Sequence, residues 1–445
     1  MLILGKNILE ISLLPLLEPE ELLALRATCR ELNNLVLASN VWKQLYFRDF
    51  GPTPYEDSTL WSELYIRRRA AKVFFWGIYA NDGDGEGVAS RPTLLRGVDH
   101  PVKDVVFTPG FVVVQDSANE LWQVSFPSKS DGSPAKPATQ LTSQGVSKFV
   151  SMHCSYFEIM ACDFKGRWHL WSCVDGSSSS FNMPYKVSPN MVAMCALTTL
   201  KLFYSPQVGL VLTSVLSNKS GSDVKCAVVP KTGGSGMEEI VDLAMGVGSK
   251  RTFASSQFIV HVDRAGELFV SSIPFEDLNH SHIESLQGIV TTQFPFYDRV
   301  AGPKTRFVKV FAECNRFVAL TDNGRALEIN LVDGNIFGEI GMRIVPDLHN
   351  VVDVALGFGH SVALTSEGEM KTWGCDSAHS GCFGLGTDEE LAQAGARFEK
   401  GTFSDREILD MPHTVKCSPA VRVHASLAST VALGLTSYDE DDEEA

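Results

Sequence analysis

The 445-residue sequence contains no run of eighteen uncharged apolar residues, the length that a membrane-spanning helix needs. Its ten cysteines include no CxxC pair, and scattered cysteines are typical of reduced thiols in the cytoplasm or nucleus. A basic surplus is also missing, because the formal net charge is −15 and residues 439–444 are all acidic. Such a charge disfavours binding to phosphates. We therefore expect a soluble cytoplasmic or nuclear protein that binds neither nucleic acid nor membrane.

One stretch, residues 351–386, has a complete strand pattern. Two runs of alternating apolar residues are separated by glycines, and the second run ends at a polar turn that contains Gly368. A third short strand is expected from Met370 to Trp373, after which Gly374 begins a glycine-rich loop. Three strands and a loop make up most of a β-propeller blade.

The same pattern recurs, less completely, along the chain. Gly324 stands 44 residues before Gly368, and 202 residues before the unit Gly166 and Trp171 match Gly368 and Trp373. Looser copies begin near Lys103, Ile240 and Val421, and a seventh is suspected at residues 191–214. The mean spacing of about 53 residues suits a four-stranded blade. The pattern predicts a mainly β protein with a seven-bladed β-propeller at residues 73–437; a long all-β sandwich would explain the strands but not the recurrent turn glycine.

The two ends of this repeated region predict how the ring closes. The pair Trp76-Gly77 at its start repeats Trp373-Gly374, and residues 421–435 at its end form one more strand pattern. We expect the last segment to complete the first blade, which removes open sheet edges. Polar stretches at residues 127–145, 175–190, 217–236 and 387–418 are interpreted as loops, and residues 438–445 as an acidic disordered tail.

The first 72 residues have helical spacing instead. Leu22, Leu25, Cys29, Leu32 and Val36 follow one another at steps of three or four, which predicts one apolar stripe on a helical surface. Some 45 residues in three small helices cannot bury such a surface alone, so another chain should cover part of it. We expect a docking module at residues 1–50 and a linker helix at 51–72; an N-terminal helical cap on the propeller is the alternative.

The segment LLPLLEPEELLALRATCRELNNLVLASNVWKQLY resembles an F-box. Leu22-Leu23, Leu25-Arg26, Cys29-Arg30 and Val41-Trp42 stand at the positions of the family pattern, although its initial Leu-Pro pair is absent. The resemblance implies that the module binds a Skp-family adaptor and, through it, a cullin. The adaptor-binding residues it implies are Ile8, Ile11, Leu13, Leu16, Leu22, Leu25 and Trp42.

The Trp-Gly pairs and the run from Gly359 to Gly368 resemble the repeats of the regulator of chromosome condensation, and an F-box before such repeats resembles the fungal SCF-associated factor group. This resemblance implies a substrate receptor of a ubiquitin ligase, whose propeller holds an unknown protein. A propeller scaffold without a ligase role and a guanine-nucleotide exchange factor are the alternatives. The residues expected to form the repeat motif are Trp76, Gly77, Gly166, Trp171, Gly324, Gly359, His360, Gly368, Trp373 and Gly374.

No catalytic residue, metal ligand or cofactor site is expected. Two groups of cysteine and histidine lack the paired spacing of a zinc site: Cys375, His379 and Cys382, and Cys162, His169 and Cys173. His360 is expected to make a local hydrogen bond and not to transfer a proton. No nucleophile and base occur in a pattern that sequence alone would support. We therefore expect a binding protein and not an enzyme.

Overall fold

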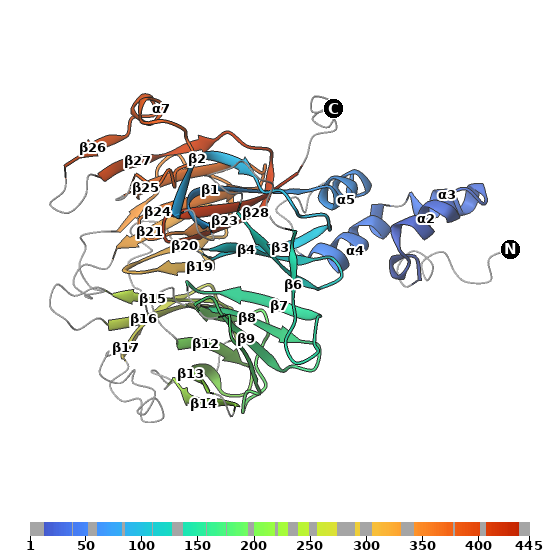
Figure 1. Cartoon of the computed structure of the whole chain (residues 1–445), viewed down its shortest axis with the longest axis horizontal. Helices are drawn as coiled ribbons and strands as arrows, with labels where there is room; N and C mark the ends of the chain where they lie inside the picture. The colour runs from blue at the N-terminus through green and yellow to red at the C-terminus, as the bar shows by residue number, and fades with distance from the viewer. Residues whose placement is uncertain are drawn as a thin grey trace.

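The computed structural model describes residues 13–37, 39–51, 60–81, 85–108, 110–126, 137–156, 158–174, 176–194, 200–218, 221–229, 239–248, 256–273, 290–293, 305–330, 342–376, 379–400 and 406–435. These residues form a seven-bladed β-propeller from which a small group of helices projects on one side (Figure 1). The predicted fold class is confirmed. No described helix is long and apolar enough to cross a membrane.

Six blades follow one another along the chain, and each begins with its innermost strand. The first two of these blades consist of β3 (Val102–Thr108), β4 (Phe111–Asp116), β5 (Leu121–Ser125) and β6 (Thr139–Leu141), and of β7 (Phe149–Cys154), β8 (Glu158–Asp163), β9 (Trp168–Ser172) and β10 (Ser178–Phe181). The next two consist of β11 (Val192–Met194), β12 (Leu200–Ser205), β13 (Gly209–Asn218) and β14 (Gly221–Val228), and of β15 (Ile240–Gly248), β16 (Ser256–Asp263), β17 (Leu268–Ile273) and β18 (Val290–Gln293). The last two consist of β19 (Phe307–Glu313), β20 (Arg316–Thr321), β21 (Ala326–Asn330) and β22 (Met342–Ile344), and of β23 (Val351–Leu356), β24 (His360–Thr365), β25 (Met370–Asp376) and β27 (Arg406–Val415) with the added edge strand β26 (Arg397–Glu399). The suspected seventh copy at residues 191–214 belongs to a real blade, since it contains β11, β12 and the first part of β13.

The remaining blade joins the two ends of the propeller. Its inner strands are β28 (Ala420–Ser426) and β29 (Ser429–Gly434), and its outer strands are β1 (Lys72–Asn81) and β2 (Gly85–Leu94). β1 and β29 are antiparallel, with Trp76 opposite Thr430 and Gly77 opposite Ser429. The expected closure of the first blade by the last segment is therefore confirmed.

The polar stretches interpreted as loops contain strands, which corrects that prediction. β6, β10, β14 and β27, the fourth strands of their blades, all lie inside them, and the stretch at 387–418 also holds the helix α7 (Asp388–Gln393). Apart from β27, which β26 flanks on its outer side, these fourth strands have a neighbour on one side only and face solvent on the outside of the ring. Their sequences therefore lack the apolar alternation of buried strands, as Ser178–Phe181 illustrates with three serines.

The projecting module consists of the 3-10 helix η2 (Leu14–Leu16) and the helices α2 (Pro19–Arg26), α3 (Arg30–Val36) and α4 (Ser39–Phe50). The stripe predicted for one helical surface is divided between α2 and α3, because the chain turns at Ala27–Cys29. Thr28 bonds back to the carbonyl of Leu25 through both its amide and its hydroxyl, and Cys29 is extended. α2 begins at a proline, and a capping box of Glu18 and Glu21 stabilises this start.

Helix α5 (Trp61–Arg69) joins the module to the propeller. Its last turn holds three arginines, of which Arg68 is buried and donates to the carbonyls of Val102 and Lys103 at the start of β3. Its guanidinium also lies 4.7 Å from the ring centroid of Phe50 in α4. One continuous apolar core contains residues of α4, α5 and the first strands of the propeller. The module is thus fixed to the ring and not suspended from it.

Candidate functional site

The turn glycines of the repeat join consecutive blades. Gly324 and Gly368 have φ of +72° and +82°, and the amide of each donates to the carbonyl three residues earlier at 3.0 Å. Their own carbonyls accept from Val351 and Ala420, the first residues of the next blades, at 3.0 and 2.8 Å. Gly166 forms the same turn, with φ of +80°, but among the described residues its carbonyl accepts no bond of this kind from the next blade.

The Trp-Gly pairs have a second structural role. Gly77 and Gly374 have φ of +105° and +118° on the third strands of their blades. A Cβ atom on Gly77 would lie 2.5 Å from the Cα of Ser429, and one on Gly374 would lie 3.0 Å from the Cα of His360. Only glycine fits both the conformation and the space, so each pair lets the third strand approach the turn between the first two.

The large side chains of the motif are buried at blade borders. Trp76 Nε1 donates to the carbonyl of Cys382 at 2.9 Å, whereas Trp373 Nε1 is 3.4 Å from Glu328 in the preceding blade. Trp171 Nε1 reaches the carbonyl of Thr142 at 3.4 Å. Gly359 packs its Cα against the carbonyl of Cys375. These contacts hold the ring together, and they offer no site to a ligand.

His360 makes a hydrogen bond, as expected, but with a distant partner. Its Nε2 lies 2.9 Å from Thr430 Oγ1 on β29, in the blade that closes the ring. Burial lowers the pKa of His360 to about 3, so its imidazole is neutral at physiological pH. The residue therefore links two blades and is not poised to transfer a proton.

Sequence reasoning missed Arg316, a buried cation at another blade border. Its guanidinium donates to Ser361 Oγ and to the carbonyl of Gly357, both at 2.8 Å, and it pairs with Glu328 at 3.3 Å. Arg316 comes from β20 and its first two partners from the next blade. A lone arginine in a strand carries no pattern that identifies its partners, so only the fold reveals the contact.

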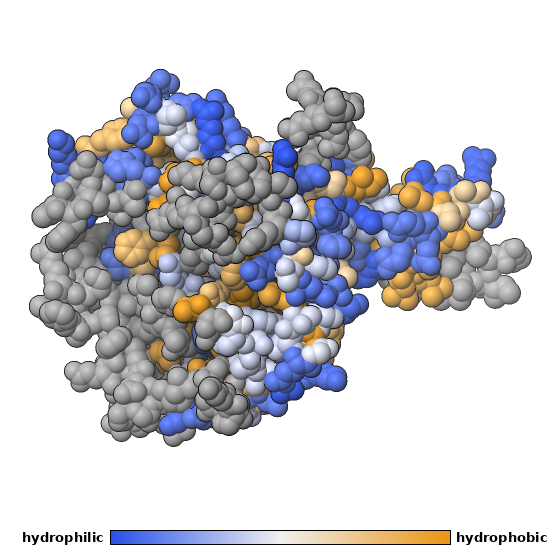
Figure 2. All heavy atoms as spheres, viewed as in Figure 1, coloured by the Kyte–Doolittle hydropathy of each residue, from blue (hydrophilic) through white to orange (hydrophobic). Residues whose placement is uncertain are grey.

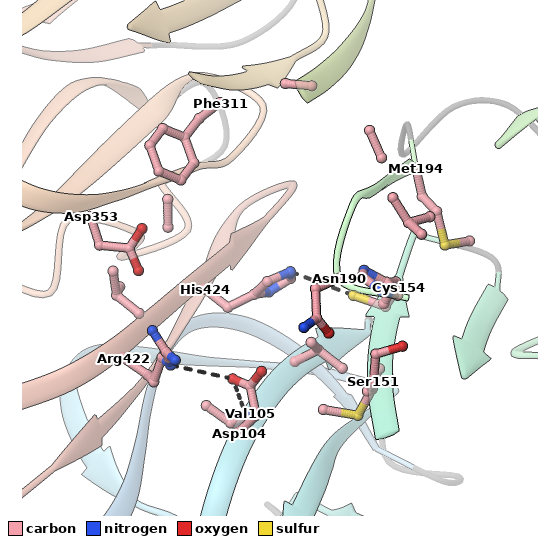
Figure 3. A pocket seen from close by; sticks show the side chains of 18 of the residues that line it. Asp104, Val105, Ser151, Cys154, Asn190, Met194, Phe311, Asp353, Arg422 and His424 are labelled. Carbon is pink, nitrogen blue, oxygen red and sulfur yellow. Dashed lines mark hydrogen bonds and ion pairs between the residues drawn. The ribbon is translucent and has the colours of Figure 1, made fainter. Parts of the chain in front are cut away.

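A central channel is lined by the innermost strands of all seven blades, and Figure 3 shows part of this lining. The volume of the channel is about 680 Å³. Phe47, Phe50 and Gly51 of the module line it as well, next to Lys103 and Asp104. These two residues lie at the start of β3, so the module lies at the rim of the channel mouth at which the inner strands begin.

A cysteine and a histidine meet inside this channel. Cys154 Sγ lies 3.5 Å from His424 Nε2, and His424 Nδ1 accepts from the amide of Phe107 at 3.3 Å (Figure 3). Burial raises the pKa of the Cys154 thiol and lowers the pKa of His424 to about 4. At neutral pH both groups are uncharged, which is the opposite of a thiolate activated by an imidazolium. The pair is therefore structural.

The expected adaptor-binding residues fall into three groups. Ile8 and Ile11 lie outside the described residues. Leu13 and Leu16 are 40% and 70% exposed, and Leu25 is partly buried. Leu22 and Trp42 are corrected, because they are 0% and 3% exposed and belong to the core of the module. Trp42 Nε1 also donates to the carbonyl of Val36 at 2.8 Å, so neither side chain is available to a partner without unfolding.

A second exposed apolar group was not expected. Leu23, Leu37 and Ile66 are 51%, 48% and 49% exposed, and they line a groove of about 760 Å³ between the module and the propeller. Apolar residues gather on the projecting helices in Figure 2. Because the stripe was assigned to a single helix, the sequence did not indicate which leucines of the module remain exposed.

Comparison with known proteins supports the propeller more strongly than the module. The family model of the regulator of chromosome condensation (RCC1) repeat matches residues 351–380. SCF-associated factor 1 of Saccharomyces cerevisiae is 48% identical over 42 residues, which are 9% of this chain and 7% of that protein. The match thus spans a small part of either chain, and the F-box resemblance stays a prediction.

Three solved structures are similar over most of the chain. Human WBSCR16 has a TM-score of 0.55 at 14% identity over 83% of this chain and 100% of its own. The structure of yeast RCC1 (Prp20) bound to Kap60 has a TM-score of 0.55 at 12% sequence identity. The match covers 83% of this chain and 90% of that one. The structure of Prp20p from Saccharomyces cerevisiae, described with its binding to Gsp1p and histones, has a TM-score of 0.54 at 13% sequence identity. The match covers 85% of this chain and 95% of that one. At such identities the likeness concerns the fold alone: the chain has an RCC1-like propeller with one recognisable RCC1 repeat.

Proposed function

We propose that this protein is a substrate receptor of an SCF-type ubiquitin ligase. The helical module binds a Skp-family adaptor and, through it, a cullin, while the propeller binds the protein to be ubiquitinated. The chain does no chemistry in this role. It brings the substrate close to the conjugating enzyme and raises its effective concentration there.

The observation that carries the proposal is that leucines of the module are exposed to solvent although the module is packed firmly against the propeller. Leu13 and Leu16 remain exposed although the module shares one apolar core with the propeller. A helix that served only as a cap would bury such side chains against the ring. Large exposed apolar side chains that gather on one element are typical of a protein interface.

The position of the module suggests where the substrate binds. The module lies at the rim of the channel mouth, next to Lys103 and Asp104. The turns that follow the innermost strands, together with α7 and β26, lie on the other side of the ring (Figure 1). We infer that the substrate binds this second face, since the adaptor and the substrate then do not compete for space.

The test is co-purification of the full chain with the adaptor and a cullin. Leu16→Asp replaces a side chain that is 70% exposed, and it should weaken adaptor binding by at least about tenfold without lowering the melting temperature. Val174→Asp, at a residue 77% exposed on the propeller, is the matched control and should bind normally. Equal binding by both variants would contradict the proposed role.

A scaffold without a ligase role is the second candidate. It is favoured by Arg68, which ties α5 to β3 in the way that an integral cap would be tied. In that case the adaptor would not co-purify with the wild-type chain, and Leu16→Asp would change neither binding nor stability.

A further inference from the structure

Three potential metal ligands meet on the blade that contains the RCC1 repeat. His379 follows β25, Asp388 is the first residue of α7, and Glu407 belongs to β27. One ligand atom from each residue lies within 4.8 Å of the other two. The Glu407 side chain is only 2% exposed, whereas His379 is 44% exposed and Asp388 is exposed too. Glu407 therefore lies at the buried inner side of the cluster, and the outer side is open to solvent.

The segment that carries these residues is held in place by the propeller. Asp376 accepts from the amide and the hydroxyl of Ser380, at 2.8 and 2.7 Å, and this turn delivers His379 with φ of +48°. Farther along, the amide of Gly386 donates to the carbonyl of Ser90 in β2 at 2.8 Å. The positions of His379 and Asp388 are thus set by contacts with two blades.

Glu407 supplies an independent reason to expect a ligand. One carboxylate oxygen contacts His379 Nδ1. The other, Oε2, is buried and has no hydrogen-bond partner among the described residues. A buried carboxylate oxygen without a partner costs free energy, and such groups usually pair with a donor or a cation. Burial raises the pKa of Glu407, which agrees with this environment.

We propose that His379, Asp388 and Glu407 bind a divalent transition-metal ion. One imidazole nitrogen and two carboxylate oxygens form a ligand set that suits Zn²⁺, Co²⁺ or Mn²⁺. Ligand atoms about 2.1 Å from such an ion lie roughly 3.4 Å apart. From separations of up to 4.8 Å, the cluster reaches this spacing by a change of up to about 1.4 Å, which the exposed side chains of His379 and Asp388 permit. Water or a partner's side chain completes the coordination on the open side.

Such an ion would tie the start of α7 to the paired strands β25 and β27, in which Asp376 lies opposite Glu407. It would do so on the side of the ring opposite the helical module. The ion would stabilise this part of the second face and leave a coordination position open to solvent. This inference stands on the cluster alone and does not depend on adaptor binding.

Titration of the full-length, chelator-treated protein with Co²⁺ tests the proposal. Visible d–d absorption of bound Co²⁺ reports nitrogen and oxygen ligands, whereas thiolate ligands add an intense near-ultraviolet charge-transfer band. We expect saturation at one equivalent without that band, and displacement by Zn²⁺ but not by Mg²⁺. A thiolate band would mean that cysteines bind the ion, and it would overturn the proposal, as would the absence of binding.

Three variants identify the ligands. His379→Ala and Glu407→Gln should each weaken Co²⁺ binding by at least about tenfold. His349→Ala, at an exposed histidine outside the cluster, is the matched control and should bind as the wild type does. Glu407→Gln keeps the shape of the buried side chain, so the metal-free melting temperature shows whether the fold survives. Unchanged affinity in a folded His379→Ala or Glu407→Gln variant would show that the cluster is only an ion pair.

Discussion

The propeller and the helical module use apolar and glycine residues in different ways. In the propeller, recurrent residues of the repeat are explained by contacts inside the chain: Gly324 bonds to the next blade, and Trp76 is 0% exposed. In the module, Leu16 is 70% exposed and Leu23 is 51% exposed. A motif residue whose contacts are all made within the chain is explained by the fold, whereas a large apolar side chain that stays exposed points to a binding partner. The predictions below test this distinction.

Deletion of residues 421–445 should have the largest effect. It removes β29 and all of β28 except Ala420. β1 then loses its inner neighbour β29, and the ring opens at an apolar strand edge. The loss should equal much of the roughly 5–15 kcal/mol that stabilises a typical domain, and the product should aggregate. Deletion of residues 438–445 removes mainly acidic residues and should leave the protein soluble. Equal solubility and equal melting temperatures for both truncations would contradict the closed ring.

Leu22→Asp and Leu16→Asp should separate the two kinds of leucine. Leu22 is 0% exposed, so a carboxylate there should destabilise the protein by about 3 kcal/mol or more in denaturant unfolding. Leu16→Asp should leave the free energy of unfolding within about 0.5 kcal/mol of the wild type, because its side chain faces solvent. A large loss of stability in Leu16→Asp would favour the reading of the module as a cap.

Gly324→Ala and Gly166→Ala compare two turns with nearly equal φ. The change at Gly166 should cost about 1 kcal/mol from backbone strain alone, since nothing lies within 4 Å of the added Cβ. At Gly324 the Cβ would lie 2.8 Å from the Cα of Asn350, so the cost should be larger by about 1–2 kcal/mol. Urea unfolding measures the loss of free energy of unfolding in each variant. Equal losses would mean that Asn350 can move aside to accommodate the added Cβ.

His360→Gln should reduce the acid sensitivity of the fold. The pKa of His360 is about 3 in the folded state, below the unfolded value of about 6.5. Between these values only the unfolded chain binds the proton, so the stability is complete above pH 6.5 and declines as the pH falls. The variant should lower this slope by about 1.4 kcal/mol per pH unit, measured by unfolding at pH 7.5, 6.0 and 5.0.

The sequence was informative where one residue type is required at one place. Gly368 and Gly374 were recognisable because no other residue fits their φ, and buried strands such as His360–Thr365 were recognisable from their apolar content. The outer strands were missed because solvent on one side removes the pattern. The partners of His360 and Arg316 were missed because they lie in other blades, and sequence spacing says nothing about the rotation between blades.

The same limit explains the errors in the module. Leu22 and Leu25 occupy adjacent positions of one stripe, yet the first is buried and the second only partly so. Which side of the stripe remains exposed depends on the break at Ala27–Cys29 and on the packing against α4. The cluster of His379, Asp388 and Glu407 was equally hidden, because its members come from separate segments and the sequence had grouped His379 with cysteines instead.

The pairing of β1 with β29 also has a consequence for biosynthesis. Gly77 lies opposite Ser429, roughly 350 residues later in the chain. At translation rates of about 5–20 residues per second, the ribosome needs roughly 20–70 s to make the partner of β1. During this interval the edge of β1 is unpaired and the ring cannot close. The ring can therefore close only after β28 and β29 have been synthesised, and until then β1 presents an open strand edge of the kind that promotes aggregation.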